Sequence, residues 1–418
     1  MSLSDISVDN GRSAAAVWAL APLLMLGPLL SCGIPGVMAP LFIGCALVAV
    51  SIDSWQRRAR PDIDRGLATL FGAFLAFGIA SIVWSINPEH VLPKTIQLIL
   101  NFGASALLVP VIGRMGTADF KRIGVFLMIG LGLGLAMYLS EVADGFKFYD
   151  LLRGGSDHDP IDSKQNKAVV LSALWLYLAF AFFFLRAGWR KRVIFVLAAA
   201  CVIGITIFTH SASAQVVLLA VIALTPALLL FPARTGALLT LAVSGLIVAT
   251  MPMIALEIDA RVEWRNSSVL NDSIKSRIEI WDQAARRTRE KTFLGWGLDS
   301  ARAMPNRGEL SYLAATRPYA RYIHHLHPHN GPLQIWFETG AAGAAMLVFL
   351  FALFARRLCA WRDTTGARFG TFIWAVAFLY TLSIWGIWQT WFVSTLCFAG
   401  VAAYAGMRRL ALEHSAVR

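Results

Sequence analysis

Long apolar segments separated by short polar stretches recur along most of the 418-residue sequence. An apolar run of about 18 or more residues can cross a bilayer as an α-helix. Only helices and closed barrels satisfy their backbone polar groups in lipid, and the alternating pattern of a barrel is absent. The pattern predicts an all-α polytopic membrane protein with about 12 transmembrane helices. Their expected centres lie near Leu23, Ile43, Leu75, Phe102, Leu131, Trp175, Ala199, Val221, Gly245, Val348, Ala377 and Phe398.

Basic residues are unevenly distributed among the connections between these segments. Arginine and lysine cluster in alternate short loops, for example at 57–65 and 186–192, whereas the loops near Gly33 and Trp388 contain none. Cytoplasmic loops carry the excess of positive charge in membrane proteins. We therefore expect both termini to be cytoplasmic.

Two outward-facing connections are long, which divides the chain into three parts. Residues 1–257 are expected to hold transmembrane helices 1–9, with a smaller outer loop at 142–167. Residues 258–331 are expected to form a large basic outer loop between helices 9 and 10. Residues 332–418 should contain helices 10–12 and a cytoplasmic tail.

The composition agrees with this organisation and adds a clue about partners. The chain is 57% apolar and only 15% charged, with a formal net charge of +12; a soluble domain has about 25% charged residues. Many of the cations lie in the large outer loop, which favours an anionic partner such as phosphate, pyrophosphate or an acidic lipid head group. For any single arginine, a solvated surface position is the alternative. The five cysteines, an odd number, indicate no disulfide framework.

The segment Asp272–Lys291 in this loop has the pattern of an amphipathic helix. Its apolar residues, among them Ile278 and Trp281, repeat every three or four positions and form one stripe. Arg277 lies at the border of the stripe, so we expect it to face the protein or the membrane. Arg286 and Arg287 are expected to project away.

Polar side chains gather at the outer ends of several predicted transmembrane helices. They include Lys94, Gln97 and Asn101 in the fourth helix and Gln334 and Glu338 in the tenth. Lys164 and Asn166 open the sixth helix in the same way. Such groups are costly in lipid and usually face a cavity or a partner. We expect a hydrophilic cavity open to the outside under the large loop; hydrogen bonding between helices is the alternative.

Four of the eight histidines lie in the stretch HHLHPHNGPLQIWFETG, His324–Gly340. A zinc site is one reading, but the stretch lacks a carboxylate at ligand spacing, so no metal is expected. Asn330 can cap a helix that starts at Gly331–Pro332, which leaves His329 at a helix N-terminus beside a basic loop. Both features disfavour the imidazolium form, and a neutral imidazole can act as a general base.

Three segments in order, SRIEIWDQA, FLGWGLDS and HNGPLQIWFETG, resemble the signature of the O-antigen ligase and polymerase superfamily. The resemblance implies a GT-C-like helical fold and a metal-independent, inverting glycosyltransferase without a cofactor. It places the active site at the periplasmic face of the bacterial inner membrane. The implied donor is an undecaprenyl-diphosphate-linked glycan, and for a ligase the acceptor is the lipid A–core oligosaccharide. Membrane lipids are the other expected partners, and no nucleic acid is expected.

The resemblance also implies roles for single residues. His329 matches the essential histidine, Arg277 the arginine that holds the diphosphate, and Glu338 the glutamate of a Glu-x-Gly motif. Many relatives carry a further arginine where this chain has Ala212, so a second cation must come from elsewhere. The candidates for that cation are Arg153, Lys164, Arg261 and Arg265, and the other substrate-binding candidates are Lys94, Gln97, Asn166, His327 and Asn330.

Two alternatives to a ligase remain at this stage. A polymerase of the same superfamily would differ only in its acceptor, and the motifs do not separate the two. A 12-span secondary transporter is an alternative from another class, but the sequence shows no repeat relating its halves and no pair of Gly/Pro-broken spans.

Overall fold

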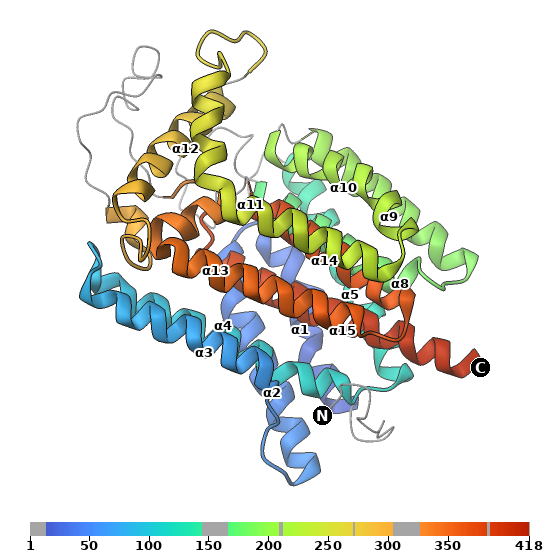
Figure 1. The fold of residues 1–418 in the computed structure, drawn as a ribbon. Coiled ribbons are helices and arrows are strands. Elements are labelled where there is room, and N and C mark those ends of the chain that lie inside the picture. Colours follow the sequence, from blue (N-terminus) through green and yellow to red (C-terminus); the bar gives the residue numbers. More distant parts are fainter. Residues whose placement is uncertain are drawn as a thin grey trace.

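The computed structural model of the chain describes residues 14–143, 166–208, 212–270, 272–303, 327–382 and 385–417, and within these residues it contains helices and no strand (Figure 1). The first five long helices are α1 (Ala14–Ser31), α2 (Met38–Arg57), α3 (Arg65–Ala80), α4 (Pro88–Gly113) and α5 (Thr117–Ala143). They are followed by α8 (Asn166–Phe183), α9 (Trp189–Phe208), α10 (Ala212–Leu230), α11 (Ala233–Arg261) and α12 (Asp272–Glu290). The last three are α13 (Gly331–Cys359), α14 (Thr364–Thr381) and α15 (Thr390–Val417). Short 3₁₀ helices η1 (Pro35–Val37), η2 (Ser81–Val83) and η3 (Ser300–Ala303) lie between them.

The expected multi-pass helical membrane protein is confirmed. Each expected span centre falls inside a helix, and eight helices of the described residues are long and apolar enough to cross a bilayer. Three further apolar helices, in α1, α8 and α10, are shorter. The number of 12 spans and the GT-C-like arrangement stay predictions.

Small residues allow the first and fifth helices to approach closely. A Cβ on Gly130 of α5 would lie 2.0 Å from the carbonyl oxygen of Leu24 in α1. One turn further along α5, a Cβ on Gly134 would lie 2.5 Å from the Pro28 side chain. In membranes, close backbone approach of this kind replaces the hydrophobic effect as the source of helix association. The buried Trp175 of α8 closes the contact by donating from Nε1 to the Leu24 carbonyl (3.1 Å).

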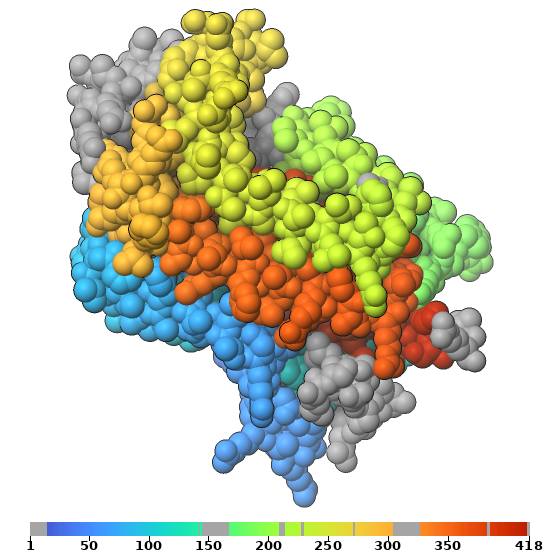
Figure 2. Space-filling view, viewed as in Figure 1, coloured from blue at the N-terminus to red at the C-terminus, as the bar shows by residue number. Residues whose placement is uncertain are grey.

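Helix α12 folds back beside the end of α11 and covers the start of α13 (Figure 1). Its apolar stripe packs into a second, smaller core, which includes Ala285, Leu333 and Phe337. The predicted amphipathic helix is therefore confirmed, and its stripe faces the protein. In the space-filling view, the yellow-to-orange segment 272–303 rests on the end of α3 (Figure 2). There the Trp84 indole donates to the Leu294 carbonyl (3.3 Å).

One expectation for α12 is wrong. The Arg286 side chain is 64% exposed, as expected, but that of Arg287 is only 12% exposed. The chain after α12 turns back beneath it, and the Trp296 indole donates to the Arg287 carbonyl (3.0 Å). This fold-back covers a position that a straight helix would have left open to water.

Ion pairs join the helices at the end of the bundle opposite α12. Arg357 at the end of α13 donates to both oxygens of Asp64, the N-cap of α3 (2.8 and 3.1 Å). Arg114, after α4, pairs with Asp53 of α2 (2.6 Å). Bidentate pairs of this kind fix geometry as well as adding energy. This end carries the short basic loops, and its cytoplasmic location stays a prediction.

The contact between α1 and α5 predicts opposite effects for two neighbouring substitutions. Gly130→Ala should lower the thermal unfolding midpoint in detergent, because overpacking against a backbone carbonyl costs about 1–3 kcal/mol. Gly132→Ala is the matched control, since nothing lies within 4 Å of its added Cβ. It should keep or raise the midpoint, because alanine favours a helix over glycine. Equal midpoints for both variants would contradict the close approach.

Candidate functional site

Helix α13 is broken in its N-terminal third, at Gly340. This residue has φ 61° and ψ −159°, which is not helical and is accessible essentially only to glycine. The break frees backbone groups that cannot stay unpaired at membrane depth. The segment after α12 supplies their partners: Trp296 N donates to Phe337 O (3.0 Å) and Gly297 N to Glu338 O (2.9 Å). In return, Ala341 N donates to Thr292 O (2.8 Å).

The glycines of the two motifs are needed for this backbone pairing. A Cβ on Gly340 would lie 2.5 Å from the Phe293 backbone, and one on Gly295 would lie 2.4 Å from the Glu338 carbonyl carbon. Both glycines also have positive φ values. The Gly-x-Gly and Glu-x-Gly motifs therefore form one contact. In it, the backbone of residues 292–297 packs directly against the backbone of the broken helix.

Glu338 is the buried anchor beside the break. Its carboxylate is fully enclosed and accepts three hydrogen bonds from three separate parts of the chain. The donors are Asp299 N (2.7 Å), Gln334 Nε2 (2.8 Å) and Trp388 Nε1 (2.5 Å). Gln334 also accepts from Ile387 N (2.9 Å) through its own amide oxygen. A buried carboxylate needs such compensation, so this arrangement ties α13, the 292–299 segment and the loop before α15 together.

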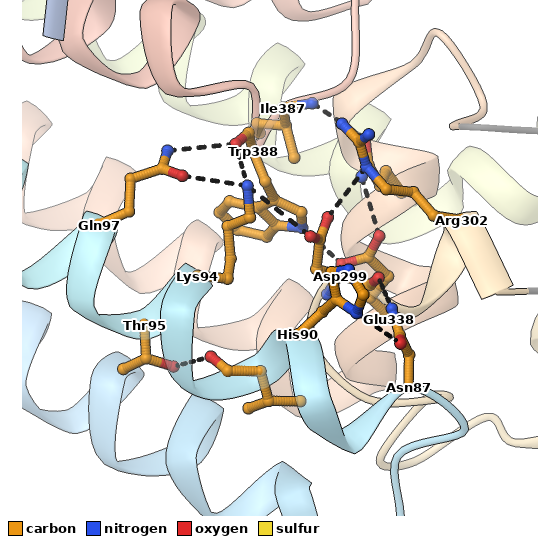
Figure 3. A network of polar contacts seen from close by, with 12 residues as sticks. Asn87, His90, Lys94, Thr95, Gln97, Asp299, Arg302, Glu338, Ile387 and Trp388 are labelled. Atoms are coloured by element: carbon orange, nitrogen blue, oxygen red, sulfur yellow. Dashed lines mark hydrogen bonds and ion pairs between the residues drawn. The ribbon is translucent and has the colours of Figure 1, made fainter.

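Lys94 brings α4 into the same network, as Figure 3 shows. Its ammonium group donates to Trp388 O (2.9 Å) and to Gln97 Oε1 (3.1 Å), and it lies 3.7 Å from Asp299 Oδ2. Arg302 approaches the other oxygen of Asp299 at 3.7 Å. Burial raises the pKa of Asp299 from its ordinary value, while Lys94 and Arg302 counteract this. The predicted polar residues Lys94 and Gln97 therefore meet protein partners at this depth.

A hydrogen bond attaches the segment that holds His327 and His329 to α12. The Trp281 indole donates to the Pro328 carbonyl (2.9 Å), directly before His329. His329 has φ 53°, and its ring lies 4.3 Å from that of His327. The predicted cap is present, since Asn330 Oδ1 accepts from Leu333 N (3.0 Å) at the start of α13. His329 therefore stands at the N-terminus of α13, on the α12 side.

Arg277 precedes Trp281 by one turn of α12, a rise of about 5.4 Å. Its side chain is mostly buried, and desolvation lowers its pKa from the ordinary value. Arginine keeps its charge because its ordinary pKa lies far above neutral pH. Because Arg277 is one turn from Trp281, and Trp281 contacts Pro328, the Arg277 guanidinium lies at the same end of the molecule as His329. The tertiary structure thus joins α12, which carries Arg277, to the segment that carries His329, although the two residues are 52 positions apart in the sequence.

Residues 197–348 match a family model whose description is O-antigen ligase. This region belongs to the O-antigen ligase superfamily. The match runs from α9 into α13 and includes α12, the Gly-x-Gly turn and His329. No curated protein matches the chain. Members of the superfamily transfer glycans, so the family assignment supports an enzyme acting on lipid-linked glycans in a membrane.

The remaining substrate-binding candidates lie in several parts of the structure. Arg261 is 80% exposed and pairs with Glu257. Arg265 donates to Asp259 (2.9 Å) and its guanidinium stacks on the Trp264 ring. Asn166 is the first residue of α8, and Arg153 and Lys164 lie outside the described residues. Residues 304–326 of the large loop also lie outside the described residues, and the hydrophilic cavity expected under this loop stays a prediction.

Some of the polar residues in the long apolar helices hydrogen-bond to a neighbouring helix and do not reach the candidate site. Asn101 of α4 is fully buried and accepts from the Ser394 hydroxyl of α15 (2.6 Å). This is the hydrogen bonding between helices that was the alternative interpretation. Sequence reasoning missed Asp299 and Trp388. Asp299 lies in the quoted FLGWGLDS motif, but Trp388 lies in a short loop with no pattern of its own.

The Glu338 anchor predicts a cost for replacing its carboxyl group. In Glu338→Gln, the new amide must place its NH₂ against one of the three donors, or force Gln334 to turn away from Ile387 N. Leaving a buried group unsatisfied costs about 1–3 kcal/mol, so the unfolding midpoint and glycan transfer should both fall. Glu257→Gln is the control, because Glu257 is 59% exposed and such pairs contribute little. An unchanged midpoint in Glu338→Gln would show that the carboxylate is not needed as an anchor.

Proposed function

We propose that the protein is an O-antigen ligase. It transfers a glycan from undecaprenyl diphosphate to the lipid A–core oligosaccharide, with inversion at the anomeric carbon and without a metal. The observation that carries this proposal is the Trp281–Pro328 hydrogen bond, which links the helix of Arg277 to the segment of His329. The match to the O-antigen ligase family over these same elements supports it.

His329 acts as the general base. The acceptor hydroxyl oxygen attacks the anomeric carbon from the face opposite the diphosphate, and its proton passes to the imidazole. A carbon–oxygen bond forms while the bond from the anomeric carbon to the diphosphate oxygen breaks. His329 lies beside the N-cap of α13, where the helix dipole disfavours a positive charge before the reaction. A neutral imidazole in the resting enzyme is ready to accept the proton.

Arg277 binds the leaving diphosphate. The electron pair of the broken bond departs with the phosphate oxygens, so negative charge develops there in the transition state. A guanidinium can meet two phosphate oxygens at once and keeps its charge when buried. Charge stabilisation by a fixed group in a desolvated site is a large catalytic contribution. The mostly buried position of Arg277 suits this role.

Glu338 is a positioning residue in this proposal. Its two oxygens already accept three hydrogen bonds from protein donors, which suits an anchor better than a proton carrier. By fixing the start of α13 and the segment after α12, it holds the two elements that carry His329 and Arg277. Lys94 and Gln97 extend the anchor to α4 through the Trp388 carbonyl.

Substitutions at the two catalytic residues should abolish transfer without unfolding the protein. His329→Asn tolerates the positive φ but cannot act as a base, and should lower the rate by about 10²–10⁴-fold. Arg277→Lys keeps a charge but loses the bidentate geometry, and should also lose most activity. The matched control is Arg286→Lys on the exposed side of the same helix. The rate of transfer is measured with purified protein and a diphosphate-linked glycan. Normal transfer in either site variant would remove that residue from the mechanism.

The acceptor separates a ligase from a polymerase. Purified protein is given the diphosphate-linked donor with equal amounts of lipid A–core and a second carrier-linked glycan, in the presence of EDTA. The expected product is glycosylated lipid A–core. Chain extension on the carrier would instead identify a polymerase. Counterflow of a labelled solute in proteoliposomes, without any transfer product, would support the transporter.

A further inference from the structure

A cavity of about 2060 Å³ lies between α3, α4, α13, α14 and α15. At the α12 end it is lined by Pro332, Thr381 and Trp388, beside the anchor network. At the opposite end it is lined by residues near the ends of α13 and α15 and the start of α3 (Figure 1). Pockets for ordinary small molecules are about 300–1,000 Å³, so this cavity suits a larger or elongated ligand.

The middle of the cavity is apolar. Its walls there carry aromatic and aliphatic side chains from helices that face one another across the space, and these surfaces suit hydrocarbon chains. The residues include Leu70, Phe71, Phe74, Phe102, Leu347, Leu350, Phe351, Ile373, Phe378 and Leu396.

The end opposite α12 is strongly basic. Three aspartates, Asp62, Asp64 and Asp363, line this end together with seven arginines, so positive charge is in excess. Some arginines are paired, as Arg357 is with Asp64. The exposed Arg65, Arg356 and Arg362 form no ion pair within the described residues. The arginines are Arg57, Arg65, Arg114, Arg356, Arg357, Arg362 and Arg408.

Three buried polar atoms at this basic end have no hydrogen-bond partner among the described residues. They are Trp361 Nε1, Tyr404 Oη and Arg408 Nε, and all three residues line the cavity. Arg408 is only 7% exposed, and its one hydrogen bond is to the Gly113 carbonyl (2.7 Å). The next residue, Arg409, pairs with Glu413 (2.8 Å). A buried cation or donor without a hydrogen-bond partner destabilises the protein.

The chemistry of these three groups indicates what would satisfy them. An indole N–H and a guanidinium N–H can only donate, and a phenol hydroxyl can also donate. A set of donors within a surplus of positive charge matches an oxyanion with several acceptor oxygens, such as a phosphate. The Trp361 and Tyr404 rings lie 6.0 Å apart, and Arg408 follows Tyr404 by one turn of α15, so the three groups gather in one region of the basic end.

We propose that this cavity binds an anionic phospholipid. Its phosphate lies at the basic end, among the exposed arginines and beside Trp361, Tyr404 and Arg408, and its acyl chains occupy the apolar walls. On the orientation expected from the basic loops, the lipid comes from the cytoplasmic leaflet, where basic pockets between helices bind acidic head groups. The site lies at the opposite end of the molecule from Arg277. It is therefore distinct from the proposed diphosphate site, and the inference goes beyond the transfer reaction.

The test measures lipid binding to the delipidated full-length protein by native mass spectrometry. The ligands are phosphatidylglycerol, phosphatidylcholine with the same acyl chains, inorganic phosphate and undecaprenyl phosphate. Phosphatidylglycerol should bind about tenfold or more tightly than the other three. The variant Tyr404→Phe/Trp361→Phe, which removes two donors beside the phosphate, should weaken phosphatidylglycerol binding. Arg362→Gln removes an exposed cation at the basic end and should weaken phosphatidylglycerol binding. It tests the proposal even if the double variant fails to fold.

Arg190→Gln is the matched control. Arg190 is an exposed arginine in a predicted cytoplasmic loop, does not line the cavity, and should leave the preference intact. Equal binding of the two phospholipids would overturn the proposal, as would phosphatidylglycerol binding of unchanged strength in both Arg362→Gln and the folded double variant. Binding of inorganic phosphate alone would indicate a free-anion site. Displacement of phosphatidylglycerol by undecaprenyl phosphate would assign the cavity to the donor lipid.

Discussion

The structure depends on how one transmembrane helix is broken and repaired. At Gly340, α13 leaves helical geometry at a depth where water cannot satisfy its backbone. The segment that follows α12 crosses the break and exchanges hydrogen bonds with it on both sides. Irregular backbone in a membrane protein is tolerated where it is buried in protein. Here the protein that buries it is a piece of the long segment between α11 and α13, so this segment is an integral part of the helical bundle.

Several features of the site follow from that repair. Because the 292–297 segment is held against α13, Asp299 can donate to Glu338, and Glu338 can in turn hold Trp388. The same fold-back keeps α12 over the start of α13, where Trp281 contacts Pro328. Histidine and arginine thus reach one end of the bundle on two elements that are each fixed at more than one point. Preorganisation of this kind is what an electrostatically assisted transfer requires.

The two ends of the molecule treat buried polar groups differently. Around Glu338, each carboxylate oxygen has protein donors. Around Arg408, the buried donors of Trp361 and Tyr404 have no protein acceptor within the described residues, and the cavity beside them has a surplus of cations. A satisfied network stabilises one conformation, whereas a set of unsatisfied donors favours a ligand that brings acceptors. This contrast separates an anchor from a binding site by their hydrogen bonding alone.

The sequence by itself determined the helical membrane architecture, the amphipathic helix at Asp272–Glu290 and the Asn330 cap, because each follows from the periodicity or chemistry of neighbouring residues. It also indicated the family through short motifs whose glycines proved to need positive φ. Only the tertiary structure decided that Glu338 meets Asp299 and Trp388, that Asn101 bonds to Ser394, and that Arg287 is covered. Those contacts join residues 39 to 293 positions apart, except at Arg287, where a local reversal of the chain acts. Periodicity reports which face of a helix is buried, but the partner on that face depends on how the helices are placed in space.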